Sequence, residues 1–262
     1  MLATILALSI YVATAAMILR QPGASAGERW LPPVALTLHG FALTHQIFHG
    51  DSITIGVNEA LSLFTWQSAL LLWALCFREP LRVMGVAIYP AAGFAAILAS
   101  GFPTEAGDII AESDWKARTH IMLSLFSAGL LTLAAVHASL LAVQERLLRG
   151  HQVTSLARAL PPLQTMERIL FQMIAIGFFL LSLTLLSGLW FIRDWMAQHL
   201  AHKTVLSISA WLIFGVLLWG RMRYGWRGRA AIRWTLSGYA VLILAYFGSK
   251  LILEQFLGQH WS

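Results

Sequence analysis

Histidine is the residue type in this chain that could most readily do chemistry, because its imidazole ligates metals and moves protons near neutral pH. The chain has nine histidines. His120 stands at the first turn of a long apolar run within residues 113–150, and His137 stands near the far end of that run. An imidazole at the start of such a run indicates a ligand-binding or proton-carrying site at a membrane boundary.

Small polar residues share a helix face with His120. Residues at i, i+4 and i+7 lie on one face of a helix, which places Ser124 and Ser127 in a stripe with His120. Such a face favours a neighbouring helix or a bound ligand over lipid. His137 lies roughly 100° around the helix from His120, so the two imidazoles cannot serve one site. His120 therefore needs a partner from another helix.

The elements that must position these residues are membrane-spanning helices. Hydrophobic residues make up 58% of the chain and charged residues 11%, whereas a soluble domain carries roughly 25% charge. A membrane helix needs about 20 apolar residues to cross the hydrocarbon core. We therefore predict an all-α integral membrane protein, a bundle of eight transmembrane helices in which residues 1–262 form a single transmembrane domain. The eight spans lie near residues 2–19, 31–49, 58–77, 82–100, 119–143, 168–192, 203–220 and 233–256.

Several functional classes are disfavoured. The single Cys76 excludes a disulfide within the chain, and the absence of a CxxCH sequence excludes a c-type cytochrome. The sequence has no HExxH or cysteine-cluster zinc motif, and no serine nucleophile with a recognisable motif. We expect no catalysis by side chains, so we predict that the protein is not an enzyme. The acidic residues between the fourth and fifth spans fit a solvated loop.

The basic residues predict the orientation in the membrane. Most of the 18 Lys and Arg residues lie in the loops after the first, third, fifth and seventh spans. Because cytoplasmic loops carry the excess of positive charge, both termini are predicted on the non-cytoplasmic side of a bacterial inner membrane. These loops also account for the net charge of +6, so nucleic acid is not an expected partner. Their densest cluster, residues 221–229, favours an anionic-lipid anchor or a cytoplasmic protein contact.

This orientation gathers histidines at one membrane boundary. His39, His45 and His137 fall inside the membrane, where a neutral, hydrogen-bonded state and a functional role are both open. His151 falls in a cytoplasmic loop. The predicted outer rim holds the other five, His49, His120, His199, His202 and His260.

His202 is the favoured partner of His120, because it opens the span near 203–220 at the same rim. Two neutral imidazoles at an apolar, aromatic-lined site are typical of axial haem ligation, with basic groups pairing with the propionates. Lys203 and Arg118 are the propionate candidates. A lone interfacial histidine is more often a hydrogen-bonded residue, and interfacial tryptophans are more often anchors, so both interpretations stay open. The candidate planar walls are Trp190, Trp195, Trp211 and Trp115.

Four segments occur in an order that resembles a known family. They are THIMLSLFSAGLL from Thr119, PPLQTMERILFQMIAIGFFLLSLTLLSGLWF from Pro161, HKTVLSISAWLIFGVLLWGRMRYGWRGR from His202 and LAYFGSKLILE from Leu244. The chain resembles the YpjD branch of the cytochrome c assembly family, whose members include CcsA, CcmC and HemX. The resemblance continues more weakly through GVNEALSLFTW from Gly56 and implies an eight-helix inner-membrane protein that handles haem.

The family's functional residues map onto this sequence only in part. His120 matches the outer-face histidine that opens a helix in the haem-exporting relatives. Their tryptophan-rich outer loop is reduced here to LWFIRDWMAQHLAHK, which keeps Trp190 and Trp195. Their membrane-embedded histidine falls on or beside Trp219, and their second outer histidine falls near residues 257–260. The resemblance thus implies a reduced outer-leaflet haem site, or a scaffold that has lost the cofactor.

These observations predict a haem-binding protein that assists haem or cytochrome assembly at the outer face of the inner membrane. The predicted b-type haem is held by His120 and His202 as iron ligands, with His260 competing for the second position and His49 a weaker third. One alternative is a cofactor-free subunit that regulates or stabilises another membrane protein, such as a transporter. The other is a transporter that uses His39 and His45 as a polar path. Expected partners are haem, membrane lipids and a further inner-membrane protein.

Overall fold

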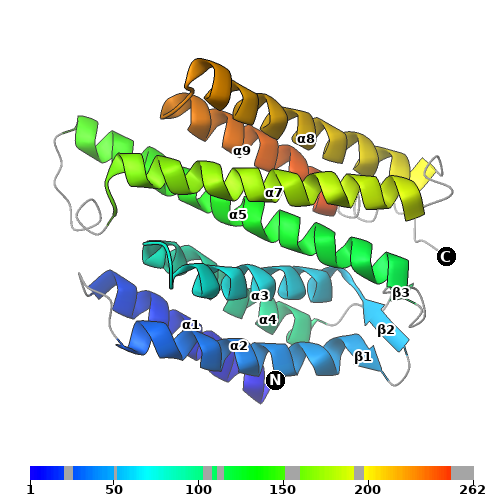
Figure 1. Ribbon diagram of the computed structural model, residues 1–262. Coiled ribbons are helices and arrows are strands. Elements are labelled where there is room, and N and C mark those ends of the chain that lie inside the picture. Colours follow the sequence, from blue (N-terminus) through cyan, green and yellow to red (C-terminus); the bar gives the residue numbers. More distant parts are fainter. Residues whose placement is uncertain are drawn as a thin grey trace. The chain divides into compact units, whose positions relative to one another are not determined.

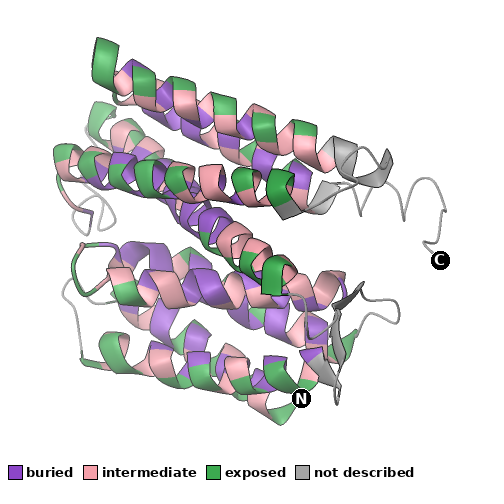
Figure 2. Ribbon diagram, turned by 45° about the vertical axis from the view of Figure 1, so that its right-hand side comes forward, coloured by how far each residue is buried: buried purple, intermediate pink, exposed green. Residues whose placement is uncertain are grey.

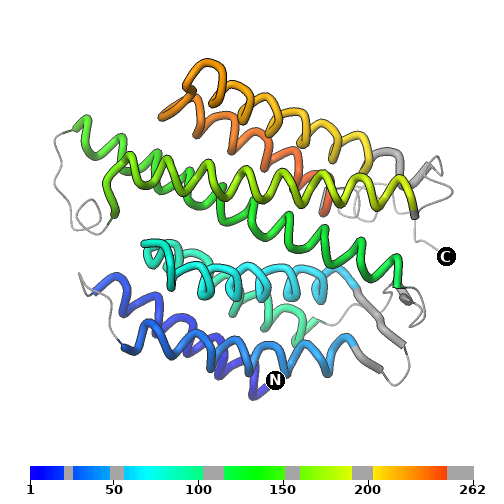
Figure 3. The backbone as a smooth tube through the Cα atoms, in the orientation of Figure 1, coloured from blue at the N-terminus to red at the C-terminus, as the bar shows by residue number. Residues whose placement is uncertain are grey.

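The computed structural model describes residues 1–20, 26–49, 52–102, 108–110, 115–150, 160–191 and 198–248. Within these ranges the chain forms eight α-helices, one in each predicted span, and three short strands (Figure 1; Figure 3). A 3-10 turn, η1 (Arg82–Met84), precedes α4, and a π-helical turn, η2 (Leu244–Gly248), extends α9. The helices are α1 (Leu2–Arg20), α2 (Ala26–Ile47), α3 (Val57–Leu75), α4 (Gly85–Gly101), α5 (Trp115–Arg149), α7 (Leu163–Phe191), α8 (Gln198–Tyr224) and α9 (Arg229–Ile243).

The described helices confirm the helical membrane class. In α2, Glu28 and Arg29 precede two prolines, and α3 carries Glu59 and Gln67. Neither helix is among the segments of the described chain that are long and apolar enough to cross a membrane. α9 has only 15 residues. Eight crossings and the outer position of both termini therefore stay predictions. Among the residues that the structure describes, five segments are long and apolar enough to cross a membrane, namely Leu2–Arg20, Arg82–Gly101, Trp115–Arg149, Leu163–Trp190 and Lys203–Tyr224.

The expected all-α structure also holds a small antiparallel sheet, whose strands pair in the order β1-β2-β3. Ile53 lies opposite both Phe48 and Ile110. The predicted span 31–49 is wrong at its end, because α2 stops at Ile47 and the chain continues as a strand. The segment between α4 and α5 contributes a strand where a solvated loop is expected. The strands are β1 (Phe48–His49), β2 (Ser52–Ile55) and β3 (Asp108–Ile110).

Two prolines lie inside α2, and the helix continues through them. Pro33 has no N–H, so it cannot bond to the carbonyl of Arg29 one turn earlier. The indole Nε1 of Trp73 in α3 donates to that carbonyl instead, at 3.1 Å. A second tryptophan of α3, Trp66, donates to the carbonyl of Leu36 at 2.8 Å. The two indoles thereby tie α3 to the proline-containing part of α2.

The chain divides into two compact units. Unit 1 comprises Met1–Arg118 and Val143–Thr165, and unit 2 comprises Thr119–Ala142 and Met166–Ser262. α5 contributes to both, with its middle part in unit 2. In each unit the buried residues form stripes along the helices, and exposed residues lie on other faces (Figure 2). The single transmembrane domain expected for residues 1–262 stays a prediction.

The core of unit 1 contains an aromatic and histidine cluster between α1, α2, α3 and α4. Tyr11 stacks on Tyr89 with ring centroids 5.8 Å apart, and it meets the His39 ring edge to face with centroids 6.1 Å apart. The Nε2 atom of His39 lies 2.9 Å from the Oγ atom of Ser62. His39 is fully buried, so a neutral, hydrogen-bonded histidine fits this position.

The helices of unit 2 approach one another through small residues. Ser127 of α5 donates to the carbonyl of Gly177 in α7 at 3.1 Å. His137 of α5 is buried, and its Nε2 atom lies 3.0 Å from the carbonyl oxygen of Met166 in α7. These two contacts fix the faces that α5 and α7 present to each other. The polar stripe that begins at His120 therefore runs into a packed interface between helices.

α1 and α4 approach closely at Gly93. A Cβ atom there would lie 2.9 Å from the Cα atom of Leu8, where backbone cannot easily give way. We predict that Gly93→Ala lowers the temperature of thermal unfolding in detergent, because overpacking costs about 1–3 kcal/mol. Gly101→Ala is the matched control, since a Cβ atom at Gly101 meets open space. Wild-type unfolding temperatures in both variants would contradict this close packing.

Candidate functional site

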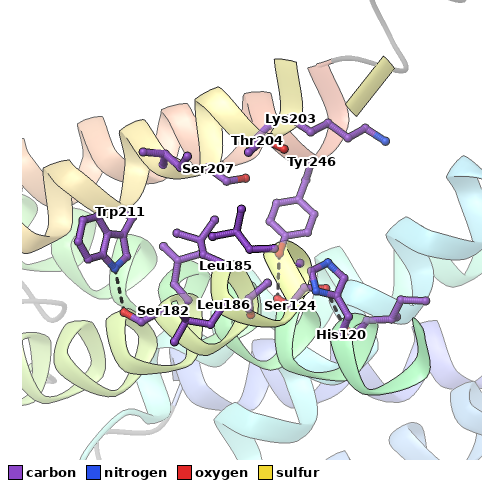
Figure 4. Close-up of a pocket in the computed structure, with 17 residues that line it drawn as sticks. His120, Ser124, Ser182, Leu185, Leu186, Lys203, Thr204, Ser207, Trp211 and Tyr246 are labelled. Carbon is purple, nitrogen blue, oxygen red and sulfur yellow. Dashed lines mark hydrogen bonds between the residues drawn. The ribbon is translucent and has the colours of Figure 1, made fainter. Parts of the chain in front are cut away.

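Unit 2 contains a cavity of about 560 Å³ between α5, α7, α8 and η2 (Figure 4). Its volume lies in the range of small-molecule and cofactor sites. Leucine side chains of α7 form much of its apolar wall. The lining residues that carry polar groups or aromatic rings are His120, Ser124, Ser182, Thr184, Lys203, Thr204, Ser207, Trp211 and Tyr246.

His120 supplies the imidazole at this cavity. It lies in α5, and its Nδ1 atom is 2.9 Å from the Oγ atom of Ser187 in α7. The Ser187 hydroxyl donates its single hydrogen to the carbonyl of Thr184 at 2.9 Å. The serine oxygen must therefore accept from His120, which places the imidazole proton on Nδ1. A neutral imidazole with its proton on Nδ1 carries a lone pair on Nε2.

Gly188 leaves room for this imidazole. A Cβ atom on Gly188 would lie 3.2 Å from Cε1 of His120, closer than an ordinary contact. The ring of His120 lines the cavity and lies beside the phenol of Tyr246 (Figure 4). A histidine that ligates a metal commonly donates its other ring N–H in this way. Ser187 of α7 therefore holds one ring nitrogen of His120 at the cavity.

Tyr246 borders the cavity from η2. Its hydroxyl donates to the carbonyl of Ser124 at 3.1 Å, which joins η2 to the helix that carries His120. Ser124 belongs to the polar stripe predicted from the sequence, and it also lines the cavity. π-helical turns occur frequently at functional sites. The sequence patterns assign no role to Tyr246, although it falls within LAYFGSK, one of the segments that carry the resemblance.

A flat aromatic wall comes from α8. Trp211 stacks on Phe178 of α7, with ring centroids 5.4 Å apart and an interplanar angle of 19°. Its Nε1 atom donates to the Oγ atom of Ser182 at 2.8 Å. The stacking contact therefore fixes the face of the indole, and the hydrogen bond fixes its N–H edge. Trp211 is one of the tryptophans considered as planar walls, and it lines the cavity.

The other predicted site residues lie in different places. Lys203 lines the cavity at its edge, and its amino group points away from the centre in Figure 4. Trp190 is 85% exposed and Arg118 is exposed on α5, and neither is a lining residue in the described part of the chain. His202 directly precedes Lys203 in α8. The side chain of His202 is outside what the structure describes.

Three further predicted site residues have no described side chain. Trp195 and His260 lie outside the described residues, and His49 is described only as part of β1 in unit 1. Within the described ranges, no group of three or more His, Cys, Asp and Glu side chains could hold a metal ion. A cofactor that brings its own metal needs only one or two protein ligands.

A family model described as "Cytochrome C assembly protein" matches residues 1–257. The chain belongs to this family. Inner membrane protein YpjD of Escherichia coli (strain K12) is 34% identical over 226 residues, which cover 84% of each chain. Protein HemX of Brevibacillus brevis is 26% identical over 216 residues, or 79% of this chain and 78% of HemX. Cytochrome c biogenesis protein CcsA of Synechocystis is 27% identical over 113 residues, or 42% of this chain and 34% of CcsA.

These matches confirm the predicted family and the predicted location in a bacterial inner membrane. The family match extends through every helix that the structure describes, so the cavity of unit 2 lies wholly within it. No solved structure matches the chain.

Proposed function

We propose that the chain binds haem in the cavity of unit 2 and assists haem or cytochrome assembly at the outer face of the inner membrane. The observation that carries this proposal is the state of His120. Its Nδ1 atom lies 2.9 Å from the Oγ atom of Ser187, whose hydroxyl lies 2.9 Å from the carbonyl of Thr184, and the proposal takes Nδ1 as protonated and Nε2 as the atom that binds the ligand. Haem iron binds a neutral imidazole through a nitrogen lone pair, and the bond on the other nitrogen orients the ring.

The residues around the cavity fit a porphyrin. The apolar side chains suit its ring, and Trp211, held against Phe178, presents a flat surface of the same kind. Lys203 at the edge of the cavity is the group proposed to pair with a propionate, followed by Arg118. When bound, haem supplies an iron centre that is carried or sensed. The chain's own residues bind and orient it, and we expect none of them to catalyse a reaction.

The family supports the proposal at a coarser level. The matching model describes a cytochrome c assembly protein, and the relative CcsA is named a cytochrome c biogenesis protein. Haem handling is the chemistry that such assembly requires. For this chain we propose in addition that the haem is b-type and that it binds at the outer face of the membrane.

His202 is the proposed second iron ligand, because it directly precedes Lys203, which lines the cavity. His260 competes for the same position. His49, the weaker third candidate from the sequence, belongs to unit 1 and is not proposed for this cavity. Trp190 and Trp195 are proposed as aromatic neighbours of the bound ring at the outer rim.

A cofactor-free subunit that regulates or stabilises another membrane protein is the second candidate function. The observation that favours it is the exposed basic end of unit 2, where Arg223, Arg227 and Arg229 are exposed between and within α8 and α9. Such a subunit would copurify with its partner and would stay colourless when haem is supplied. An absorption spectrum of the purified protein separates the two functions.

His120→Ala tests the haem proposal directly. Wild-type protein, purified in mild detergent from cells supplied with haem, should show a Soret band, and the variant should lose most of it because the axial ligand is gone. His45→Ala is the matched control, since His45 is an exposed histidine of α2 in unit 1. A Soret band of equal intensity in His120→Ala, or a colourless wild-type protein, would refute haem binding at this site.

Ser187→Ala tests whether the hydrogen bond to His120 matters. Removing a partner that orients a metal-ligating histidine typically costs about 10–100-fold in affinity, so haem titration should show a dissociation constant raised by about 10-fold or more. Ser187→Thr keeps the hydroxyl and should restore most of the affinity. If Ser187→Ala binds haem as tightly as the wild type, this serine does not position the ligand.

His202→Ala and His260→Ala identify the second ligand. Two axial imidazoles give low-spin iron, so loss of one should shift the absorption spectrum towards the high-spin form while some haem remains bound. We expect the shift in His202→Ala and not in His260→Ala. The reverse result would assign the position to His260, and no shift in either variant would exclude both.

A further inference from the structure

We propose that unit 1 holds a second binding site, a cavity of about 460 Å³ that takes the phosphodiester head group of an anionic phospholipid. The cavity lies where Ile18 of α1, Arg29 of α2, Phe77 after α3 and Arg82 of η1 come together. In the described part of the chain it shares no lining residue with the cavity of unit 2. The proposal is therefore independent of haem binding.

One pair of opposite charges forms a fixed wall of this cavity. Nε of Arg82 is 3.0 Å from Oε2 of Glu28, and Nη2 of Arg82 is 2.9 Å from Oε1, which makes a two-point ion pair. The Glu28 side chain is 6% exposed and that of Arg82 is 20% exposed. Such a pair compensates its own charge and holds the first turn of α2 against η1.

Arg29 supplies a positive charge beside this pair. Its guanidinium lies over the ring of Phe77, 4.7 Å from the ring centroid. Within the ranges that the structure describes, Arg29 forms no ion pair. Its backbone is held as well, because Trp73 donates to the Arg29 carbonyl that Pro33 cannot use. An arginine stacked on an aromatic ring keeps its N–H edge available, and phosphate oxygens match that edge.

The surroundings favour an amphiphile over a free anion. Trp30, which is 65% exposed, and Phe77 line the cavity beside Arg29, and tryptophan is enriched where lipid head groups meet acyl chains. A phosphodiester carries one negative charge, which the guanidinium of Arg29 balances. The positive-inside rule predicts this end of the helices on the cytoplasmic side, where basic pockets between helices bind anionic head groups. Arg20 and Arg78, both exposed near this end, add positive charge.

Cys76 reports on this site without any labelling substitution, because it lines the cavity and is the chain's only cysteine. Full-length protein in mild detergent is incubated with phosphatidylglycerol, with phosphatidylcholine or with inorganic phosphate. The rate at which a small maleimide modifies Cys76 is then measured. Phosphatidylglycerol is expected to slow the reaction several-fold, and phosphatidylcholine and phosphate are expected to slow it much less.

Arg29→Gln should abolish the difference between the two lipids, because it removes the charge and keeps a polar side chain. Arg168→Gln is the matched control, since Arg168 is an exposed arginine of α7 in unit 2 and lies outside the basic cluster 221–229, and it should behave like the wild type. Lipid that copurifies with the protein gives a readout independent of the thiol. By mass spectrometry, phosphatidylglycerol per protein should fall in Arg29→Gln and not in Arg168→Gln.

Each other outcome would overturn the proposal. Equal protection by both lipids, or unchanged copurified lipid in Arg29→Gln, would remove the evidence for head-group recognition. Equal protection by inorganic phosphate would assign the cavity to a small soluble anion. Loss of protection in both variants would indicate general attraction to a positive surface. The haem spectrum should be the same in both variants as in the wild type, so failure here leaves the haem proposal unaffected.

Discussion

A polar group inside a membrane-spanning bundle cannot be satisfied by bulk water, so its partner has to come from the protein. Much of the described structure follows from this constraint. His39 in unit 1 meets Ser62, and His137 in unit 2 meets the carbonyl of Met166. Many hydroxyls turn back to a carbonyl one turn earlier in their own helix, which lets small polar residues lie within apolar runs. Thr14, Thr65, Ser68, Thr132, Ser139, Ser182 and Thr184 all do so.

The same constraint separates His120 from the other two histidines. Each of the three places one ring nitrogen in a hydrogen bond. In His39 and His137 the second nitrogen is enclosed by a packed core, without a partner in the described part of the chain. In His120 the ring borders a cavity of about 560 Å³. The surroundings, and not the residue type, therefore distinguish a candidate ligand from a structural histidine.

The sequence predicts those features that depend on neighbours within one or two helical turns. The eight helices and the stripe from His120 to Ser127 are of this kind. The partners of the site are not, because Ser187 is 67 residues from His120 and Tyr246 is 122 residues from Ser124. The only local sign of Ser187 in the sequence is that Ser187 and Gly188 are two small residues near the end of a long apolar run.

Helix ends and strands are also not predicted from the sequence, because they too depend on hydrogen-bond partners. Hydropathy marks where the chain is apolar, but hydrogen bonding decides where a helix ends. α8 therefore begins at Gln198 and continues to Tyr224, beyond the apolar run 203–220 at both ends. The strands have two to four residues each, too few to show an alternating pattern. Their pairing joins Ile53 to Ile110, a contact that no short segment encodes.

In both cavities, the side chain that would bind a ligand lies on one segment, and the residues that orient this side chain lie on another. His120 of α5 is aimed by Ser187 of α7, and Arg29 of α2 is aimed by Phe77 and Trp73 of the α3 segment. Apolar packing is non-directional, so in a largely apolar bundle such directional contacts decide where a polar group points. A ligand that binds only when the group is correctly aimed also favours the packed arrangement of the two segments. Occupancy of either cavity is therefore coupled to the packing of the helices around it.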